Sequence, residues 1–464
     1  MPRPLPLKEL TREALRAFTR DGSPRWRSTA AVFTSMSALA ATSLLPGPAL
    51  AEPRSELCAL KRTAAHHSEG VDTWNAAYTR PTRALDAVMV FLSFPDSEPQ
   101  TTPAELTADY FPATSDFFER ASYGRFALRP HPQRDWIRMP HPSTSYAIQR
   151  DWSSAHRAAY LRDALAVADA RVDFSRYDIV YFVADPDAPG VDSDATKVVN
   201  LDTPMRADGK DIRRVVTVFE KHPPDRLVLA HETGHVFDLP DLYHRPVDGK
   251  GDWDTYVGDW DLMGSQFGLA PDLFGWHKWK LGWLDPRQVA CVRGRGSTRL
   301  TLEPLSAGPA TVGEAGAPAS VLQAGSGAGG FSGSGGSGSS GASGASGART
   351  FGSGRGTKLA VARTGPDTVL AFEARGSAGN DGSTCTQGVL VYRVRSEAES
   401  GRGPIEVLDA HPHSESCWED SVYPPLADAP VALGESFTVP GENVRIEVED
   451  RTATGAWTVK ITTG

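Results

Sequence analysis

Two histidines four residues apart are the most informative chemical feature of the sequence. His231 and His235 lie in the segment LAHETGHVFDLPD, which begins at Leu229. On a helix, residues four apart project from the same face one turn apart, so both imidazole rings can bind one tetrahedral zinc ion. Glu232 follows the first histidine, and its carboxylate is placed to take a proton from a water molecule on the metal. We therefore expect His231 and His235 to be zinc ligands and Glu232 to be the general base.

A third ligand is expected beyond the end of this helix. The helix should end near Asp238, because Leu239 precedes Pro240 and a residue before proline is disfavoured in helical geometry. Asp241 lies ten residues after His231, where extended motifs of this kind supply a third ligand once the chain has turned back. A carboxylate oxygen is an accepted zinc ligand. The alternatives are that Asp241 is a solvated loop acid, or that another Asp or Glu further on takes its place.

A methionine in a glycine-bounded turn follows shortly afterwards. Met263 lies within GDWDLMG, residues 258–264, and only six methionines occur in the chain. A thioether beneath the two histidines would give them an apolar floor and fix the orientation of their rings. We expect Met263 to fill this role rather than to be an ordinary core methionine.

Strands alternating with helices must position these residues. Short apolar runs of strand length are separated by segments with helical spacing of apolar residues. This alternation predicts an α/β or α+β catalytic domain with a largely parallel or mixed sheet over residues 84–290. The expected strands are Val88–Leu92, Ile179–Val183 and Val215–Phe219, and the expected helices are Thr114–Arg120 and Tyr160–Ala170.

After about residue 290 the pattern changes to short strands alone. Alternating apolar residues are broken by Gly, Pro, Asp and Asn, and no helical period competes. Residues 291–464 are therefore expected to form a small all-β, sandwich-like accessory domain. Within it, residues 324–356 are almost wholly Gly, Ser and Ala, which cannot bury enough surface to fold, so we expect a disordered loop there.

The N-terminal residues have the order of a secretory signal. Arg25 and Arg27 precede a weakly apolar run over residues 30–45, and an Ala-Leu-Ala triplet ending at Ala51 offers a cleavage site. A membrane anchor is the alternative, but a spanning helix needs about 20 predominantly apolar residues. We expect a secreted, extracellular protein with no membrane association after cleavage. Its first parts would be a signal peptide over residues 1–51 and a short propeptide or N-terminal arm over residues 52–83.

Four cysteines, an even number, suit an exported protein with two disulfide bonds. Four cysteines allow three pairings. Sequence proximity favours Cys385–Cys417, which leaves Cys58–Cys291 to tie the mature N-terminus to the domain junction. A free Cys58 that ligates the metal and keeps a precursor inactive is the alternative.

The composition limits which classes of protein and of binding partner remain. The chain has 464 residues and a formal net charge of -9, with 40% hydrophobic and 9% aromatic residues. At roughly 150 residues per domain, this length predicts two or three domains. An acidic chain lacks the basic face that nucleic acids and anionic membranes require, so we expect neither as a partner. The aromatic content argues against global disorder and for a soluble globular protein.

Taken together, these segments resemble the secreted bacterial metallopeptidases of the immune-inhibitor-A type, the M6 group of metzincin-like zinc peptidases. The resemblance covers roughly residues 84–290 and is looser in the β half, where it rests on GVLVYRV from Gly388. It implies a zincin-like catalytic domain that hydrolyses peptide bonds in proteins, with zinc at His231, His235 and Asp241. The segments that carry it are HETGHVFDLPDLY from His231, GDWDLMG from Gly258, APDLFGWHKWKLGWL from Ala270, VMVFLSFPD from Val88 and SYGR from Ser122.

Two positions depart from the pattern of that family. The family usually has Gly where this chain has Asp238, at a turn that needs a positive φ. Asp tolerates that region better than most residues, so we expect the turn to survive. The family often has an Asp-rich calcium loop at the position of residues 172–178, which lack its repeated Asp-Gly pattern. Calcium is a further candidate cofactor at the acid-rich residues 185–194 and 248–254, where solvated loop acids are the alternative.

The sequence thus predicts a secreted zinc endopeptidase that acts on protein or peptide substrates. A metal-activated water would attack the peptide carbonyl, and Glu232 would accept its proton and return it to the leaving amine. Tyr243 and Tyr256 are candidates to hold the developing oxyanion. Two rival functions stay open. One is an inactive exported binding or adhesion protein on a peptidase scaffold, and the other is a zinc amidase that acts on cell-wall peptides.

Overall fold

The computed structural model describes residues 54–66, 68–225, 227–246, 250–307, 356–414 and 416–464, which belong to one compact unit. The predicted signal peptide and nearly all of the predicted Gly/Ser/Ala loop lie outside these residues. Within the described ranges, no helix combines the length and the apolar character that a membrane span requires.

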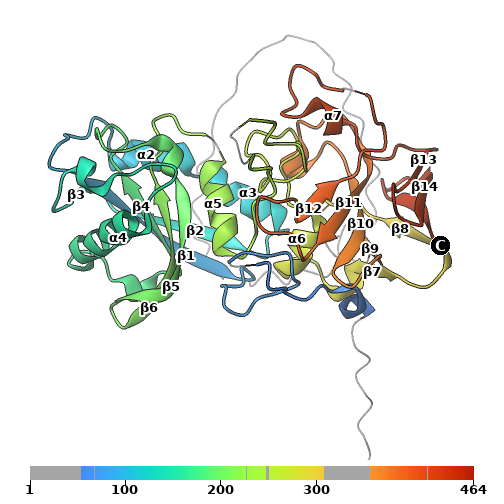
Figure 1. Ribbon diagram of the computed structural model, residues 1–464, viewed down its shortest axis with the longest axis horizontal. Coiled ribbons are helices and arrows are strands. Elements are labelled where there is room, and N and C mark those ends of the chain that lie inside the picture. The colour runs from blue at the N-terminus through green and yellow to red at the C-terminus, as the bar shows by residue number, and fades with distance from the viewer. Residues whose placement is uncertain (1–53, 67, 226, 247–249, 308–355, 415) are drawn as a thin grey trace, which may run out of the picture. The chain divides into compact units, whose positions relative to one another are not determined.

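A six-stranded mixed sheet occupies the first half of the described chain (Figure 1). β1 pairs in parallel with β2, β3 and β4, and β4 pairs in parallel with β6, whereas β5 runs antiparallel to β6 at one edge of the sheet. The mixed sheet and its three predicted strands, now β1, β4 and β6, are therefore confirmed. The strands are β1 (Ala84–Ser93), β2 (Ala127–Pro132), β3 (Ile137–Arg138), β4 (Ile179–Ala184), β5 (Lys197–Ala207) and β6 (Lys210–Val218).

Helices cover both faces of this sheet. In β1, Val88 and Val90 point into a core shared with α4 (Ser154–Asp169), while Met89 and Phe91 point into a second core shared with α3 (Ala113–Ala121) and α5 (Val228–Val236). A strand buried on both faces explains why the run is continuously apolar. Both predicted helices are confirmed, as α3 and α4. The other helices are α2 (Pro103–Tyr110), α6 (Gly275–Lys280) and α7 (Pro424–Ala427).

Short 3-10 helices lie between these elements. They are η1 (Arg54–Cys58), η2 (Ser143–Tyr146), η3 (Phe174–Arg176), η4 (Ser193–Ala195), η5 (Pro286–Gln288) and η6 (Gly379–Asp381).

Two sheets make up the second half. A five-stranded sheet has the order β12-β11-β10-β9-β7, and a four-stranded sheet has the order β13-β14-β15-β8. Phe372 of the first and Trp457 of the second belong to one hydrophobic core, so the two sheets share a core, and the sandwich-like arrangement stays a prediction. Their strands are β7 (Val289–Val292), β8 (Gly296–Leu302), β9 (Leu359–Arg363), β10 (Thr368–Arg375), β11 (Gly388–Arg395), β12 (Ile405–Val407), β13 (Ser436–Thr438), β14 (Val444–Arg451) and β15 (Trp457–Thr463).

The other face of the five-stranded sheet joins the core of the first half. Val361 of β9 and Tyr392 of β11 belong to the same cluster as Phe237, which directly follows α5, and Trp276 of α6. Hydrophobic packing is therefore continuous from α5 into the β half. The division proposed at residue 290 stays a prediction.

The N-terminal segment that begins at Arg54 packs into the same core. Buried tryptophans hold its backbone: Trp276 Nε1 donates to the Val71 carbonyl at 2.9 Å and Trp283 Nε1 to the Pro81 carbonyl at 2.7 Å. Cys58 pairs with Cys291 and Cys385 with Cys417, with Cα–Cα distances of 5.9 and 6.4 Å. Both predicted pairings are confirmed, and the alternative of a free Cys58 is wrong.

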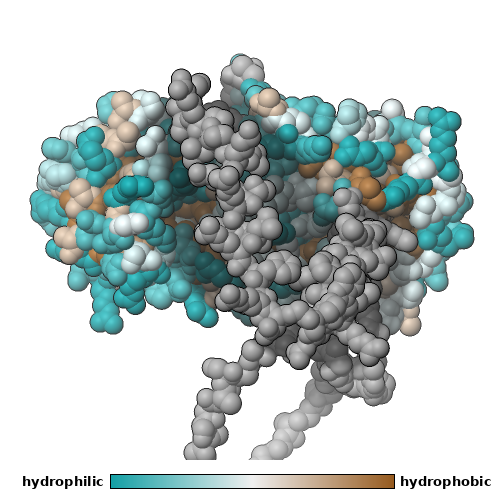
Figure 2. All heavy atoms as spheres, turned by 90° about the horizontal axis from the view of Figure 1, so that it is seen from below, coloured by the Kyte–Doolittle hydropathy of each residue, from teal (hydrophilic) through white to brown (hydrophobic). Residues whose placement is uncertain are grey.

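The surface is mainly hydrophilic where the described residues can be seen in Figure 2. Large hydrophobic side chains that are exposed within the described ranges are single residues well separated in the sequence, namely Leu57, Phe267, Trp418 and Leu433. Such scattered residues are normal for a globular protein.

Candidate metal centre

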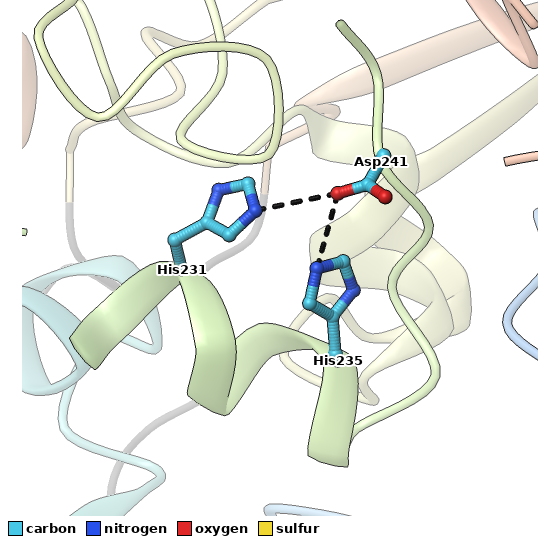
Figure 3. Close-up of side chains that lie close together, drawn as sticks. All are labelled: His231, His235 and Asp241. Carbon is cyan, nitrogen blue, oxygen red and sulfur yellow. Dashed lines mark ion pairs between the residues drawn. The ribbon is translucent and has the colours of Figure 1, made fainter. Parts of the chain in front are cut away.

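The two histidines of α5 point to the same side of the helix (Figure 3). Their ring centroids are 4.9 Å apart, and both side chains are buried. His231 Nδ1 lies 2.9 Å from the Leu262 carbonyl oxygen, and His235 Nδ1 lies 2.7 Å from that of Leu239. A carbonyl oxygen can only accept, so these bonds assign the proton of each neutral ring to Nδ1. In this neutral form, each Nε2 carries a lone pair.

Asp241 completes the group. Its Oδ1 lies 3.3 Å from His231 Nε2 and 3.1 Å from His235 Nε2, and no hydrogen-bond donor within the described residues reaches this buried oxygen. Two imidazole lone pairs therefore face a carboxylate oxygen, an arrangement of acceptors that needs a cation between them. The structure thus brings together the three predicted ligands.

The donor set fits a tetrahedral ion. Zinc bonds of about 2.0–2.2 Å to nitrogen and oxygen place tetrahedral ligand atoms about 3.3–3.6 Å apart. The observed nitrogen–oxygen distances of 3.1 and 3.3 Å are close to this spacing. Two imidazoles and one carboxylate also match the ligand types of catalytic zinc sites, in which a fourth position is open.

Electrostatics indicate what occupies the group when a metal is not bound. Burial alone would lower the pKa of His235, but the Asp241 carboxylate outweighs it and raises the pKa to about 10. Burial opposes ionisation of Asp241 too, yet His235 and His231 hold the pKa of its carboxyl well below the usual range. A proton is therefore held between His235 and Asp241 at neutral pH, and a metal ion must displace it.

The end of α5 brings Asp241 back towards the helix. The Asp238 N–H donates to the His235 carbonyl at 3.2 Å and the Leu239 N–H to the Gly234 carbonyl at 3.2 Å, which is the bond pattern of a Schellman motif. Asp238 has φ 73, in the left-handed region where glycine is usual. The predicted helix end and the predicted tolerance of Asp at this turn are both confirmed.

The Asp238 side chain accepts hydrogen bonds that a glycine at this position could not accept. Its Oδ2 accepts from Lys280 Nζ at 2.6 Å and its Oδ1 from the Gly70 N–H at 3.2 Å. Asp238 and Lys280 are both fully buried. Burial raises the pKa of Asp238 to about 6, against the opposing effect of Lys280. The residue therefore links the turn after α5 to α6 and to the N-terminal segment.

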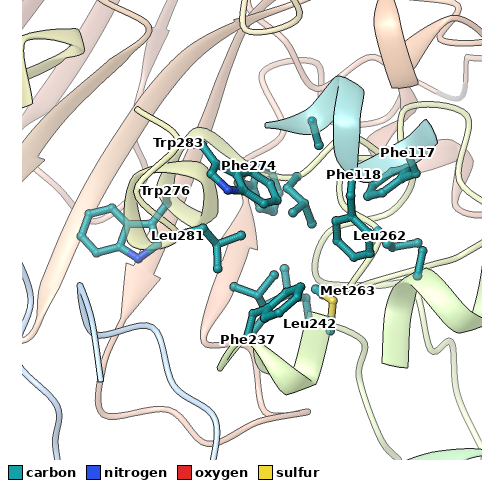
Figure 4. Packing of buried hydrophobic residues seen from close by; sticks show 14 of the residues in the cluster. Phe117, Phe118, Phe237, Leu242, Leu262, Met263, Phe274, Trp276, Leu281 and Trp283 are labelled. Atoms are coloured by element: carbon teal, nitrogen blue, oxygen red, sulfur yellow. The ribbon is translucent and has the colours of Figure 1, made fainter. Parts of the chain in front are cut away.

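The methionine turn packs against α5 (Figure 4). Met263 is fully buried, and a Cβ added to Gly234 would lie 2.5 Å from its sulfur. The glycine inside the histidine motif therefore makes room for the thioether next to α5. The apolar floor beneath the two rings stays a prediction. Asp261 fixes the turn, because its Oδ1 accepts from the Met263 N–H at 2.8 Å and its Oδ2 from the Phe274 N–H at 2.7 Å.

Glu232 lies beneath the edge strand β5. The Val198 N–H donates to Glu232 Oε2 at 2.6 Å. Burial raises the pKa of the Glu232 carboxyl, and the opposing effect of His235 and His231 does not cancel it. A raised pKa moves a carboxylate towards the range in which it exchanges protons near neutral pH.

An open cavity of about 300 Å³ gives access to these residues. Tyr243 lines it, and its ring stacks on His231 with centroids 6.3 Å apart. Tyr256 does not line it; its ring meets His244 edge-on at 5.2 Å and it packs against the hydrophobic core. Of the two candidate tyrosines, the structure therefore places Tyr243 at the site and Tyr256 in packing. The cavity is lined by Ser68, Glu69, Arg150, Asp194, Thr196, Lys197, Val198, Asn200, Glu232, His235, Asp241, Tyr243, Arg245 and Trp253.

Ser400 holds Asp241, the proposed third ligand, and was not expected from the sequence. Ser400 Oγ accepts from the Asp241 N–H at 2.9 Å and lies 3.3 Å from Asp241 Oδ2, to which it can donate. The Gly401 N–H donates to the Asp241 carbonyl at 2.9 Å. These contacts come from the loop after β11, 159 residues away in sequence, and no local pattern marks them. Asp261 carried a weak signal, since it precedes Met263 by two residues in a glycine-bounded turn.

A second group of candidate ligands lies in the β half. Atoms of Asp409, His411 and Asp428 come within 4.8 Å of one another. His411 Nδ1 lies 2.5 Å from the Asp428 carbonyl and His411 Nε2 lies 2.8 Å from Glu435 Oε2. The acid-rich residues proposed for calcium contribute to no such group within the described ranges, and residues 248 and 249 lie outside them.

Comparison of the chain with known protein-family models finds no match, and comparison with curated proteins finds none either.

Proposed function

We propose that the protein is a secreted zinc endopeptidase with a zincin-like catalytic domain. The observation that carries this proposal is the convergence of His231 Nε2, His235 Nε2 and Asp241 Oδ1 beside a cavity that Glu232 also lines. The resemblance of the motif segments to the immune-inhibitor-A type of peptidase supports the same conclusion. Two disulfide pairs are in keeping with an extracellular location.

Zinc held by these three residues would supply a Lewis acid that polarises water and a substrate carbonyl. Glu232 is positioned as the base: the Val198 N–H occupies Oε2, so Oε1 is the oxygen that accepts a proton from water. The raised pKa lets the same carboxyl pass that proton to the leaving amine. Burial raises the pKa of Tyr243, so its phenol stays protonated and can donate to the developing oxyanion.

The edge strand favours a peptide as the substrate. β5 is the outermost strand, pairs with β6 on one side, and lines the cavity through Val198 and Asn200. The backbone groups on the free side of an edge strand can pair with an extended peptide. A peptide bound in this way would pass over Glu232 and the three ligands.

The test is cleavage of casein by the mature, zinc-loaded chain. We expect cleavage that a chelator abolishes and added zinc restores. Glu232→Gln should keep one zinc ion per chain and lose activity by at least about 100-fold, since it removes a general base. Full proteolysis by the zinc-loaded variant would refute the role of Glu232.

The same assay separates the rival functions. A zinc-loaded wild-type chain that cleaves no protein would favour the inactive binding protein. Release of peptide fragments from peptidoglycan, with casein left intact, would favour the cell-wall amidase. The first rival is weakened because all three candidate ligands lie in one group and Glu232 lines the cavity beside it.

A further inference from the structure

Three cationic side chains line the candidate active-site cavity. Arg150 comes from the loop before α4, Lys197 begins β5, and Arg245 follows the segment that carries Asp241. Lys197 is adjacent to Val198, whose N–H holds Glu232. Lys197 is therefore the direct neighbour in sequence of the residue whose N–H positions Glu232, the proposed base.

Among the described residues, protein carboxylates form an ion pair with only one of these three cations. Arg150 lies over the Trp253 ring at 4.7 Å, and Lys197 Nζ donates to the Arg150 carbonyl. Within the described ranges, neither makes an ion pair. Arg245 pairs with Asp151 at 3.0 Å, but the Asp151 side chain is 82% exposed, and such pairs hold a cation weakly.

Lys197 lies close to other cations. Burial lowers the pKa of Lys197, and the nearby Arg157 and Arg245 lower it further, against the opposing effect of Glu232 and Asp151. Two further acids line the cavity: Glu69 accepts hydrogen bonds from Asn200 and Ser68, and Asp194 is exposed to solvent. A group of like charges beside a cavity, one of them half-buried, is an arrangement that a bound anion stabilises.

We propose that Arg150, Lys197 and Arg245 form a specificity wall that binds a substrate carboxylate next to the bond that is cleaved. The carboxylate is either the side chain of an aspartate or glutamate or the free C-terminus of a peptide. Guanidinium groups bind carboxylates through paired hydrogen bonds, which a neutral amide of the same shape cannot replace. This inference rests on the proposed peptidase function and names its substrate class.

The test uses the zinc-loaded mature chain and fluorogenic peptides that differ in one residue near the cleaved bond. One series compares Glu with Gln, and each peptide is made with a free and with an amidated C-terminus. We expect kcat/KM to favour one carboxylate form by about 10-fold or more, as for hydrogen bonds to charged groups. A Glu-over-Gln preference identifies the side chain, and a preference for the free terminus identifies the C-terminal carboxylate. A ratio near one in both comparisons overturns the inference.

Charge reversal separates recognition from misfolding. Arg245→Glu should remove the carboxylate preference and raise kcat/KM for the corresponding Lys peptide above that for the Glu peptide, a gain that a damaged fold cannot produce. Arg213→Glu is the matched control, because Arg213 is half-exposed on β6 and does not line the cavity. It should keep the wild-type ratio. If casein and all peptides remain uncleaved, the proposed function fails; if they are cleaved without preference, only the specificity wall fails.

Discussion

Two groups in this molecule have nearly the same composition and opposite chemistry. His231, His235 and Asp241 form one, and Asp409, His411 and Asp428 form the other. In the first, each imidazole donates through Nδ1 to a backbone carbonyl and turns Nε2 to an oxygen that lacks a donor. In the second, His411 uses both nitrogens, one towards a carbonyl and the other towards Glu435.

The difference shows that closeness of ligand types does not define a metal site. His411 has two acceptors as partners, a carbonyl and a carboxylate, and this arrangement favours the protonated imidazolium form. Burial opposes this charge, but the hydrogen bond and the charge of Glu435 raise the pKa of His411. In α5, by contrast, the Nε2 atoms of two histidines converge on one carboxylate oxygen, and a single proton cannot serve both rings. We therefore expect one zinc ion per chain, at the first group.

We expect the largest difference between the two groups in the zinc content of variants that each lack one imidazole. His235→Ala should abolish stoichiometric zinc, because the two remaining ligands cannot complete the site. His411→Ala should keep one zinc ion per chain. Elemental analysis of the purified variants after dialysis checks both expectations. Stoichiometric zinc in His235→Ala, or its loss in His411→Ala, would reverse the assignment.

The pH dependence of zinc affinity tests the proton held at the first group. Because the pKa of His235 is raised to about 10, zinc binding near neutral pH must release this proton. Apparent affinity should therefore rise with pH, by up to about tenfold per unit between pH 7 and 9. Competition with a chromophoric chelator, corrected for the chelator's own protonation, measures the slope. A flat profile would contradict the shared proton.

Ser400 tests whether a residue that only positions a proposed ligand of the first group affects metal binding. Ser400→Ala removes both side-chain contacts that hold Asp241, and we expect zinc affinity to fall by about 10-fold, in line with other residues that orient metal ligands. Ser297→Ala, on the exposed strand β8, is the matched control. Thermal unfolding of the metal-free proteins should be similar for the two variants. Unchanged affinity in Ser400→Ala would assign the serine a packing role alone.

The smallest expected effect is on the free energy of unfolding and comes from the His411–Glu435 ion pair of the second group. The pKa of His411 is raised above 6.5 and that of Glu435 is lowered below 4.5 by their mutual hydrogen bond, among other contacts. The pair therefore stabilises the fold between these limits. Its contribution is lost as pH falls through the folded-state pKa of Glu435 or rises through that of His411. Because both groups are partly exposed, the contribution is no more than about 1 kcal/mol. Urea unfolding of wild type and His411→Ala at pH 5.5 and 9 should show a larger difference at pH 5.5.

The first group was predictable because its chemistry is local. His231, Glu232, His235 and Asp241 fall within eleven residues, so helical spacing and the proline-limited helix end place them together. The strands of the mixed sheet were predictable from continuous apolar runs. Ser400 and the Val198 N–H were not, because each reaches the site through tertiary folding. The pairing of Asp238 with Lys280 was missed for the same reason: the backbone requirement was visible in the sequence, but the distant partner was not.

The Cys58–Cys291 bond closes a covalent ring of the backbone with a sequence separation of 233 residues. This ring contains the whole six-stranded sheet, α5 and all three proposed ligands. A single cut by another protease at an exposed loop within it would leave the two fragments joined until the bond is reduced. Nicked molecules would then run as one species on a non-reducing gel and as two under reduction, with both pieces of the metal centre still held in one molecule.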